Sequence, residues 1–139
     1  MSAAGLDPLG RSGLHYAALK DDVAWDIVEG LTAAGADIDL QETRSGYTPL
    51  HLAVQDGALR AATLLLDAGA DLDAATGQGE RPLHLSVANW RSSEDGAMIR
   101  LLLDRGADRS ATDAAGHTPA DLAQGQFRFP PELAALLAG

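Results

Sequence analysis

Cysteine is absent from this sequence of 139 residues, so the chain can form neither a disulfide nor a thiolate metal site. Aromatic residues make up only 4% of the chain, whereas hydrophobic residues together make up 46%. We therefore expect a core built mainly from Leu, Ala, Val and Ile, which suits thin helices packed closely in layers. The hydrophobic content also excludes a disordered chain.

Long hydrophobic runs are lacking as well. No segment approaches the ~18 consecutive apolar residues that a membrane-spanning helix needs. Residues 1–13 contain no apolar run of the kind found in secretory signals. The length suits one cooperative unit rather than two. The sequence therefore predicts a single domain over residues 1–139, located in the cytoplasm and without a membrane partner.

Basic residues are scarce relative to acidic ones. Twenty Asp and Glu residues against ten Lys and Arg residues give a formal net charge of -10. A charge of this sign repels phosphate backbones, which argues against a nucleic-acid partner. Lys20 is the only lysine, and this bias toward arginine, with frequent Ala and Gly, indicates a GC-rich, bacterial genome.

A short phrase recurs along the chain. Its first three copies begin with glycine and end in Leu-His, and a weaker fourth copy ends in Ala-Asp: residues 10–15, 46–51, 79–84 and 116–121. A second phrase, Gly-Ala-Asp, follows each of the first three copies, at residues 35–37, 69–71 and 106–108. The leading glycines lie 33 to 37 residues apart, which indicates one structural unit per copy.

This pattern resembles the ankyrin repeat, which has a period of ~33 residues and a Thr-Pro-Leu-His core. The resemblance extends from about residue 7 to residue 137. It implies an all-α solenoid of about four helix-turn-helix repeats, with little or no strand and a projecting loop after each helix pair. The repeats are expected approximately at 7–42, 43–75, 76–112 and 113–139, the last of them acting as a cap.

The second copy also makes physical sense without a family name. Thr48 is suited to cap a helix whose first turn is set by Pro49, and Gly57 is suited to end that helix after about two turns. A second helix is predicted over about 59–68, with Gly69 as its stop. Neither helix can bury its apolar stripe alone, so the units must stack.

The predicted core follows from the same stripe. Leu59, Ala62, Leu65 and Leu66 recur at helical spacing, and we expect Leu50, Leu65 and Leu66 to be fully buried. Near the end of the chain, two phenylalanines and two prolines precede a short predicted helix. We interpret this helix as the closing cap, with its apolar stripe at Leu133, Leu136 and Leu137.

Two insertions interrupt the regular spacing. Compared with the second copy, the first carries two extra residues around 20–25 and the third carries four around 89–96, each between the paired helices. Trp25 and Trp90 lie in or beside these insertions, where the stacking core does not require an aromatic residue. Tryptophan is a favoured interface anchor. The alternative is that each indole covers its own lengthened turn.

The recurring histidines suggest a metal site that geometry argues against. His15, His51 and His84 occupy equivalent positions, and equivalent positions in stacked helices lie roughly 8–10 Å apart. Two nitrogens bound to one zinc must each lie ~2.0–2.1 Å from it. We expect instead that a ring nitrogen of each histidine bonds to the backbone of the connecting loop. His117 falls in a loop without an assigned role.

Other candidate motifs also favour structure over chemistry. The Gly-x-Gly of residues 77–79 has no preceding strand, so the dinucleotide-binding fingerprint fails. The pairs Asp37/Asp39 and Asp71/Asp73 lack the remaining ligands of a calcium loop, and we expect them to shape the loops. No serine stands in a strained nucleophile turn. The sequence predicts no catalytic residue, no metal and no cofactor.

The resemblance implies that the loop tips and the exposed sides of the first helices bind a partner protein. The positions that align with the family's variable contacts, together with Trp90 from the insertion, are Arg11, Lys20, Arg44, Tyr47, Gln55, Asp56, Gln78, Glu80 and Asn89, with Leu9, Ser45, Ala88, Ala115 and His117 as further aligned positions. The predicted function is a stand-alone, non-enzymatic binder, monomeric when free, that sequesters, inhibits or scaffolds a partner. The alternative is a regulatory module detached from a larger enzyme or complex.

The charge refines this prediction. Asp56 and Glu80 are expected to present acidic groups to a basic partner surface. Small acidic binders of this kind resemble immunity proteins that neutralise basic toxins in bacteria, and an immunity or antitoxin role is one specific form of the prediction. The alternative is that the charge only keeps an Ala- and Leu-rich stack soluble.

Overall fold

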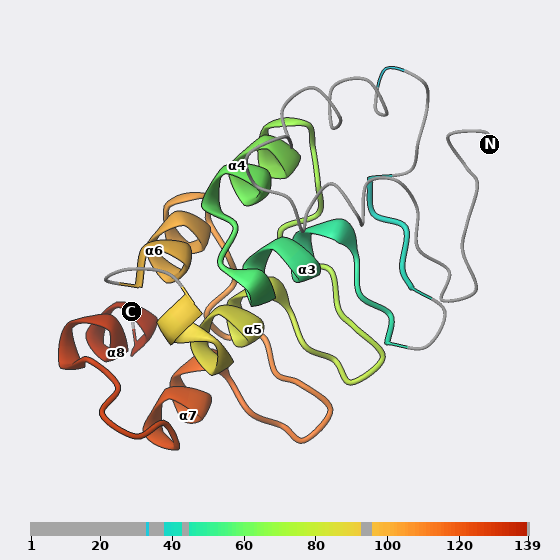
Figure 1. Ribbon diagram of the computed structural model, residues 1–139. Coiled ribbons are helices and arrows are strands. Elements are labelled where there is room, and N and C mark those ends of the chain that lie inside the picture. Colours follow the sequence, from blue (N-terminus) through green and yellow to red (C-terminus); the bar gives the residue numbers. More distant parts are fainter. Residues whose placement is uncertain (1–32, 34–37, 43–44, 93–95, 139) are drawn as a thin grey trace.

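The computed structural model describes residues 33, 38–42, 45–92 and 96–138 (Figure 1). Within these residues the regular structure consists of six α-helices and one short 3-10 helix, and it contains no strand. The predicted all-α solenoid is therefore confirmed. The first predicted helix pair lies outside the described residues.

The helices form two rows (Figure 1). The first row consists of α3 (Pro49–Asp56), α5 (Pro82–Ala88) and α7 (Pro119–Gln124), and the second row consists of α4 (Leu59–Asp67), α6 (Ala97–Asp104) and α8 (Pro131–Ala138). Each first-row helix packs against its partner in the second row, and α5 packs against both α3 and α7. The loops that join one pair to the next project to the same side of the stack (Figure 1).

Local chemistry explains where α3 begins and ends. The hydroxyl oxygen of Thr48 accepts a hydrogen bond from the backbone N–H of His51, and Pro49 occupies the first turn, as predicted. Gly57 ends the helix in the left-handed conformation, with a φ of 74°. In α7, Thr118 caps the helix in the same way. These caps satisfy backbone groups that a short helix otherwise leaves unpaired.

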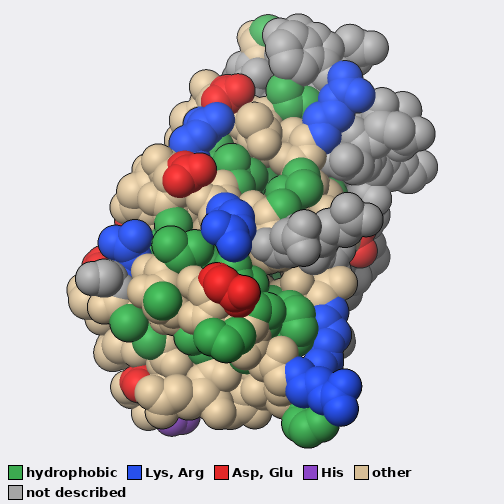
Figure 2. All heavy atoms as spheres, turned by 90° about the vertical axis from the view of Figure 1, so that its left-hand side faces the viewer, with side chains coloured by type: hydrophobic (Ala, Val, Ile, Leu, Met, Phe, Trp, Pro, Cys, Tyr) green, Lys and Arg blue, Asp and Glu red, His purple; other side chains and the backbone are tan. Residues whose placement is uncertain are grey.

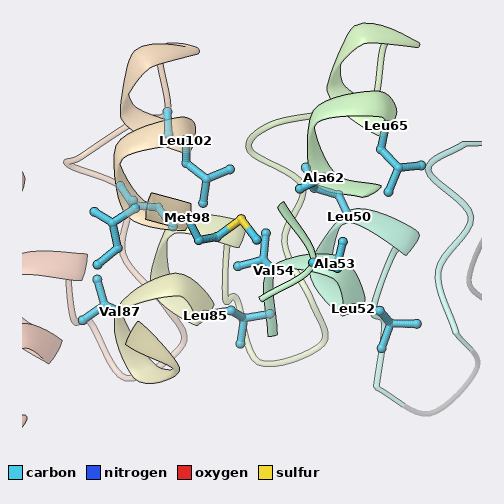
Figure 3. Close-up of a cluster of buried hydrophobic side chains, with 14 of the residues drawn as sticks. Leu50, Leu52, Ala53, Val54, Ala62, Leu65, Leu85, Val87, Met98 and Leu102 are labelled. Carbon is cyan, nitrogen blue, oxygen red and sulfur yellow. The ribbon is translucent and has the colours of Figure 1, made fainter. Parts of the chain in front are cut away.

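The core lies between the two rows of helices (Figure 3). Leu50 and Leu65 are fully buried, as predicted, but the prediction for Leu66 was wrong, because this side chain is only half-buried. Three consecutive leucines span ~200° of a helix, which is wider than the apolar stripe that one packing face requires. In the last pair, Leu133 and Leu137 of the predicted apolar stripe are buried, and Leu136 is half-buried.

We call each helix pair, together with its projecting loop, a level. Aspartate side chains join the loops of adjacent levels. The Oδ1 atom of Asp39 accepts a hydrogen bond from the backbone N–H of Asp71 (2.8 Å). One level further on, Asp73 Oδ1 accepts the N–H of Asp108 (3.1 Å). Within a loop, Asp71 Oδ1 accepts the N–H of Asp73 (3.0 Å). The expected structural role is confirmed for these three acceptors, and Asp37 lies outside the described residues.

The buried histidines also bridge levels. His51 Nδ1 accepts the N–H of Thr48 (3.1 Å), and His51 Nε2 lies 3.0 Å from the carbonyl oxygen of Glu80 in the next loop. Since a carbonyl oxygen can only accept, we assign the ring proton to Nε2. His84 Nε2 likewise lies 2.9 Å from the carbonyl oxygen of His117. The predicted bond to the connecting loop is thus confirmed for both, and His15 lies outside the described residues.

The last helix pair lacks this forward bond. Asp121 stands where the earlier levels have histidine, and its Oδ2 atom accepts the backbone N–H of Thr118 (3.0 Å). The carboxylate therefore replaces the local acceptor that a histidine Nδ1 provides. An ionised carboxylate has no proton to donate to a carbonyl of a following loop.

Candidate functional site

Backbone hydrogen bonds hold the projecting loops to one another. The N–H of Gly77 donates to the carbonyl of Ser45 (3.1 Å), and the N–H of Ala114 donates to the carbonyl of Gln78 (2.9 Å). Gly79 makes the second contact possible, because a Cβ atom there would lie 2.8 Å from the nitrogen of Ala114. The loop tips are therefore held at a fixed spacing.

Three of the predicted binding residues are exposed on this scaffold. Gln55 and Asp56 form the last turn of α3, and Gln78 lies at a loop tip. None of these side chains forms a hydrogen bond or ion pair that holds the described part of the stack together. They are available to a partner without loss of internal contacts.

Tyr47 and Glu80 occupy a more enclosed position between two loops. Both residues are half-buried, and the Tyr47 ring centroid lies 5.5 Å from that of His51. Burial raises the pKa of the Tyr47 phenol, and the nearby carboxylates of Glu80 and Glu42 raise it further. The phenol therefore stays neutral and keeps its proton over the physiological range. The neutral phenol lies beside two acidic groups.

The remaining predicted positions divide into two sets. Arg11, Lys20 and Arg44 lie outside the described residues. Asn89 and Trp90 lie together just after α5. Asn89 is half-buried, and its Nδ2 atom donates to the carbonyl of Leu85 (3.0 Å), which helps to end the helix.

The insertion after α5 folds against the segment that precedes α8. It contains the 3-10 helix η2 (Trp90–Ser92), and the half-buried Trp90 ring packs edge-on against Phe129, with ring centroids 5.5 Å apart. The Arg91 guanidinium lies over the Trp90 ring at 4.6 Å, and Arg91 Nη2 donates to the carbonyl of Phe127 (2.9 Å). Trp90 therefore covers a distant segment as well as its own turn. Trp25 lies outside the described residues.

Sequence analysis missed several neighbours of Trp90. A pocket of about 210 Å³ beside this indole is lined by Ala88, Asn89, Trp90, Arg91 and Gln126. Nearby, the Phe127 side chain is 73% exposed. The sequence contained one signal that Phe127 and Phe129 differ in burial. They are separated by one residue, and side chains with that spacing point the same way only in an extended strand. In the turn they take opposite roles, one packed and the other exposed.

Several loop carboxylates have lowered pKa values because they accept backbone hydrogen bonds. The N–H of His117 donates to Asp113 Oδ1 (2.9 Å), and this bond is the main reason that the pKa of Asp113 is lowered. The N–H of Thr118 lowers the pKa of Asp121 in the same way. These groups are ionised at neutral pH and hold the last loop in place. Among the residues that the structure describes, no cluster of three or more His, Asp or Glu side chains could hold a metal ion.

Charges of both signs are interleaved on the side of the molecule that carries α6 and α8. Figure 2 shows arginine side chains among Asp and Glu there, with hydrophobic side chains exposed between them. One ion pair joins Arg105 Nη2 to Asp67 Oδ1 (2.7 Å), linking α6 to α4. No helix in the described part of the chain is long and apolar enough to span a membrane.

This arrangement defines a helical repeat protein, with two rows of helices, hydrogen-bonded loops and histidines that join adjacent levels. Residues 14–113 match the family model for ankyrin repeats in three copies. The chain belongs to the ankyrin-repeat family. Its repeats make it a protein-interaction module.

Several well-characterised proteins are similar to part of this chain. The nuclear factor NF-kappa-B p105 subunit of Gallus gallus is 40% identical over 79 residues, which is 56% of this chain and 8% of the relative. Protein phosphatase 1 regulatory subunit 27 of Homo sapiens is 39% identical over 85 residues, 61% of this chain and 53% of the relative. Ankyrin repeat and SOCS box protein 16 of Homo sapiens is 40% identical over 80 residues, 57% of this chain and 17% of the relative. The similarity therefore covers only part of each relative's length.

Proposed function

We propose that residues 1–139 form a single domain that binds a partner protein through its loop tips and the exposed ends of its first-row helices, without catalysing a reaction. The observation that carries this proposal is the bonded row of loops, in which Gln78 is both anchored through its carbonyl and exposed. A preorganised surface loses little conformational entropy on binding. Binding sequesters, inhibits or scaffolds the partner.

The electrostatic part of this proposal is a basic surface on the partner. The net charge is -10, and the exposed Asp56 lies on α3 beside Gln55. The half-buried Glu80 adds a carboxylate next to the Tyr47 phenol. Complementary charge raises the association rate and selects the partner more than it adds affinity. Neutralisation of a basic toxin, as an immunity protein does, is one form of this function.

We call Asp56 and Glu80 the acidic face, and charge-reversal variants test whether it contacts the partner. The chain is used to capture a partner from cell extract, and the association rate of the identified, purified partner is measured while NaCl is raised from about 0.05 M to about 0.5 M. We expect the rate to fall about tenfold or more with salt, and to fall similarly in the double variant Asp56→Lys, Glu80→Lys.

A matched double variant separates the face from the net charge. Asp104→Lys with Glu132→Lys makes the same change of charge at exposed positions on α6 and α8. This control should bind at close to the wild-type rate. Equal slowing by both double variants, or no effect of salt, would mean that the charge serves solubility and that the proposed role of the acidic face in binding is wrong.

A second candidate is a regulatory module of a larger enzyme assembly. One similar protein is named as a regulatory subunit of protein phosphatase 1. If this chain acts in that way, the captured partner will be an enzyme or its subunit, and adding the purified chain will change its turnover. A captured protein without catalytic subunits argues for the stand-alone binder instead.

A further inference from the structure

A basic and aromatic cluster lies where the insertion after α5 meets the segment before α8. We call Trp90, Arg91, Phe127 and Arg128 the arginine–aromatic patch. Phe127 is the one large hydrophobic side chain that is exposed in the described part of the chain. The Arg128 guanidinium carbon lies 5.1 Å from the Phe127 ring centroid, and that of Arg91 lies 4.6 Å from the Trp90 ring. Each arginine thus lies over an aromatic ring.

Two features hold this patch in its geometry. The hydrogen bond from Arg91 Nη2 to the carbonyl of Phe127 joins its two halves, and the Trp90–Phe129 contact lies beneath them. Arg128 has a φ of 60°, and it is the one non-glycine residue with a positive φ among those described. A long side chain adopts this conformation at a cost, and such strain gathers at binding sites.

The charge of the patch is opposite to that of the whole chain. Arg105 pairs with Asp67, but neither Arg91 nor Arg128 forms an ion pair with a carboxylate of the described residues. At the lower right edge of Figure 2, arginine side chains gather beside a hydrophobic one. In a chain with a net charge of -10, two guanidinium groups thus keep their capacity for an external anion.

The indole of Trp90 carries an unpaired donor and lies beside a pocket. The Trp90 Nε1 atom is buried and has no hydrogen-bond partner, although most buried polar groups have one. Trp90 and Arg91 both line the pocket of about 210 Å³, together with Ala88, Asn89 and Gln126. A carboxylate in this pocket has acceptor oxygens for the Arg91 guanidinium.

We propose that the arginine–aromatic patch binds an acidic segment of a partner protein, in which a carboxylate pairs with Arg91 and Arg128 and an adjacent apolar side chain covers Phe127. This inference rests on the proposed function, because it names a second contact surface for the bound protein. We call the loop tips and the exposed ends of the first-row helices the loop face. The patch adjoins Asn89 at the end of α5, so a partner on the loop face reaches the patch by extending past that helix end. An acidic segment is the occupant because the patch supplies cations, aromatic faces and donors in one place.

A synthetic peptide tests this proposal without a known partner. The probe is a fluorescein-labelled peptide in which Glu alternates with Phe and Leu, and its binding to the full chain is measured by fluorescence anisotropy. We expect the Kd to rise at least about tenfold in Arg91→Glu and in Arg128→Glu, since each loses a charge-assisted contact and gains a repulsion. Phe127→Ala should weaken binding severalfold. The same peptide with Gln in place of Glu should bind at least about tenfold more weakly to the wild-type chain.

Arg60→Glu is the matched control, because Arg60 is an exposed arginine on α4 outside the patch. It should leave the Kd within about twofold, and melting curves should show that all variants fold. Equal weakening by Arg60→Glu, or equal binding of the Glu and Gln peptides, would overturn the proposal. So would tighter binding of labelled single-stranded DNA than of the peptide, or a loss of self-association in Arg91→Glu without any loss of peptide binding.

The outcomes for the patch and for the loop face are distinguishable. If the peptide does not bind the patch while the captured partner still depends on Asp56 and Glu80, the patch inference fails and the proposed function stands. If the peptide binds through Arg91 but the captured partner is insensitive to both double variants, the acidic face fails instead.

Discussion

Leu65 and Leu66 are neighbours on α4 with different surroundings. Leu65 is fully buried in the core between the rows (Figure 3), whereas Leu66 is half-buried at its edge. We expect Leu65→Ala to lower the free energy of unfolding by about 2–5 kcal/mol, because it leaves a cavity that the packed helices cannot close. Leu66→Ala should cost less than half as much, since water already reaches that site. Urea denaturation of both variants measures the difference, and equal losses would show that the assigned core is wrong.

Single residues also show where sequence reasoning ends. Thr48, Pro49 and Gly57 were predictable as helix boundaries because each acts on the backbone within one turn of itself. The surroundings of Trp90 were not predictable, because Phe129 and Gln126 reach it from a distant part of the chain. The prediction for Leu66 on α4 was wrong for a related reason. A helical stripe shows which residues can be buried, but the neighbouring helices decide which of them are buried.

At the scale of the elements, the projecting loops depend on glycine in two different ways. Gly69 and Gly79 both have positive φ values, 98° and 72°, but a Cβ on Gly69 would meet nothing within 4 Å. Gly69→Ala should therefore cost roughly 1–2 kcal/mol from backbone strain alone. Gly79→Ala should cost more, because the added methyl collides with the Ala114 backbone and breaks its bond to Gln78. Thermal melts compare the two, and a Gly79→Ala loss no larger than that of Gly69→Ala would contradict the rigid loop row.

The paired helices were the most predictable elements. Their capping residues, apolar stripes and terminal glycines follow local rules, so the all-α stack followed from the sequence, although α5 begins after Arg81 without a side-chain cap and ends at Asn89. The site was predictable only in part. Gln55, Asp56 and Gln78 are exposed as the family pattern implies, but Glu80 is half-buried because its loop closes around Thr76, whose N–H bonds to the Glu80 carbonyl (3.0 Å).

For the whole molecule, acidic pH should be destabilising. The pKa values of Asp108, Asp113 and Asp121 are lowered because they accept hydrogen bonds, from the Ser110 hydroxyl and from the N–H groups of His117 and Thr118 respectively. A carboxylate whose pKa is lower in the folded state stabilises the fold above its unfolded pKa of about 3.9, and this contribution is lost as the pH falls through the folded value.

We therefore expect the Tm to fall between about pH 5 and about pH 3. The double variant Asp113→Asn, Asp121→Asn should have a lower Tm at neutral pH and a smaller fall on acidification. The double variant Asp56→Asn, Asp104→Asn is the control, because both carboxylates are exposed and accept no backbone bond from the described residues. An unchanged fall in the first variant would mean that other groups set the acid limit.

The change from histidine to aspartate at one helix position has a consequence for how such a chain can be lengthened. His51 and His84 each bond forward to the following level, whereas Asp121 bonds only within its own. A duplicated unit inserted before residue 113 would meet a forward donor on one side and a matching carbonyl on the other. A unit appended after α8 would find no such donor until Asp121 was changed to histidine. The stack can therefore be lengthened internally without altering these bonds, whereas lengthening it after α8 calls for Asp121→His.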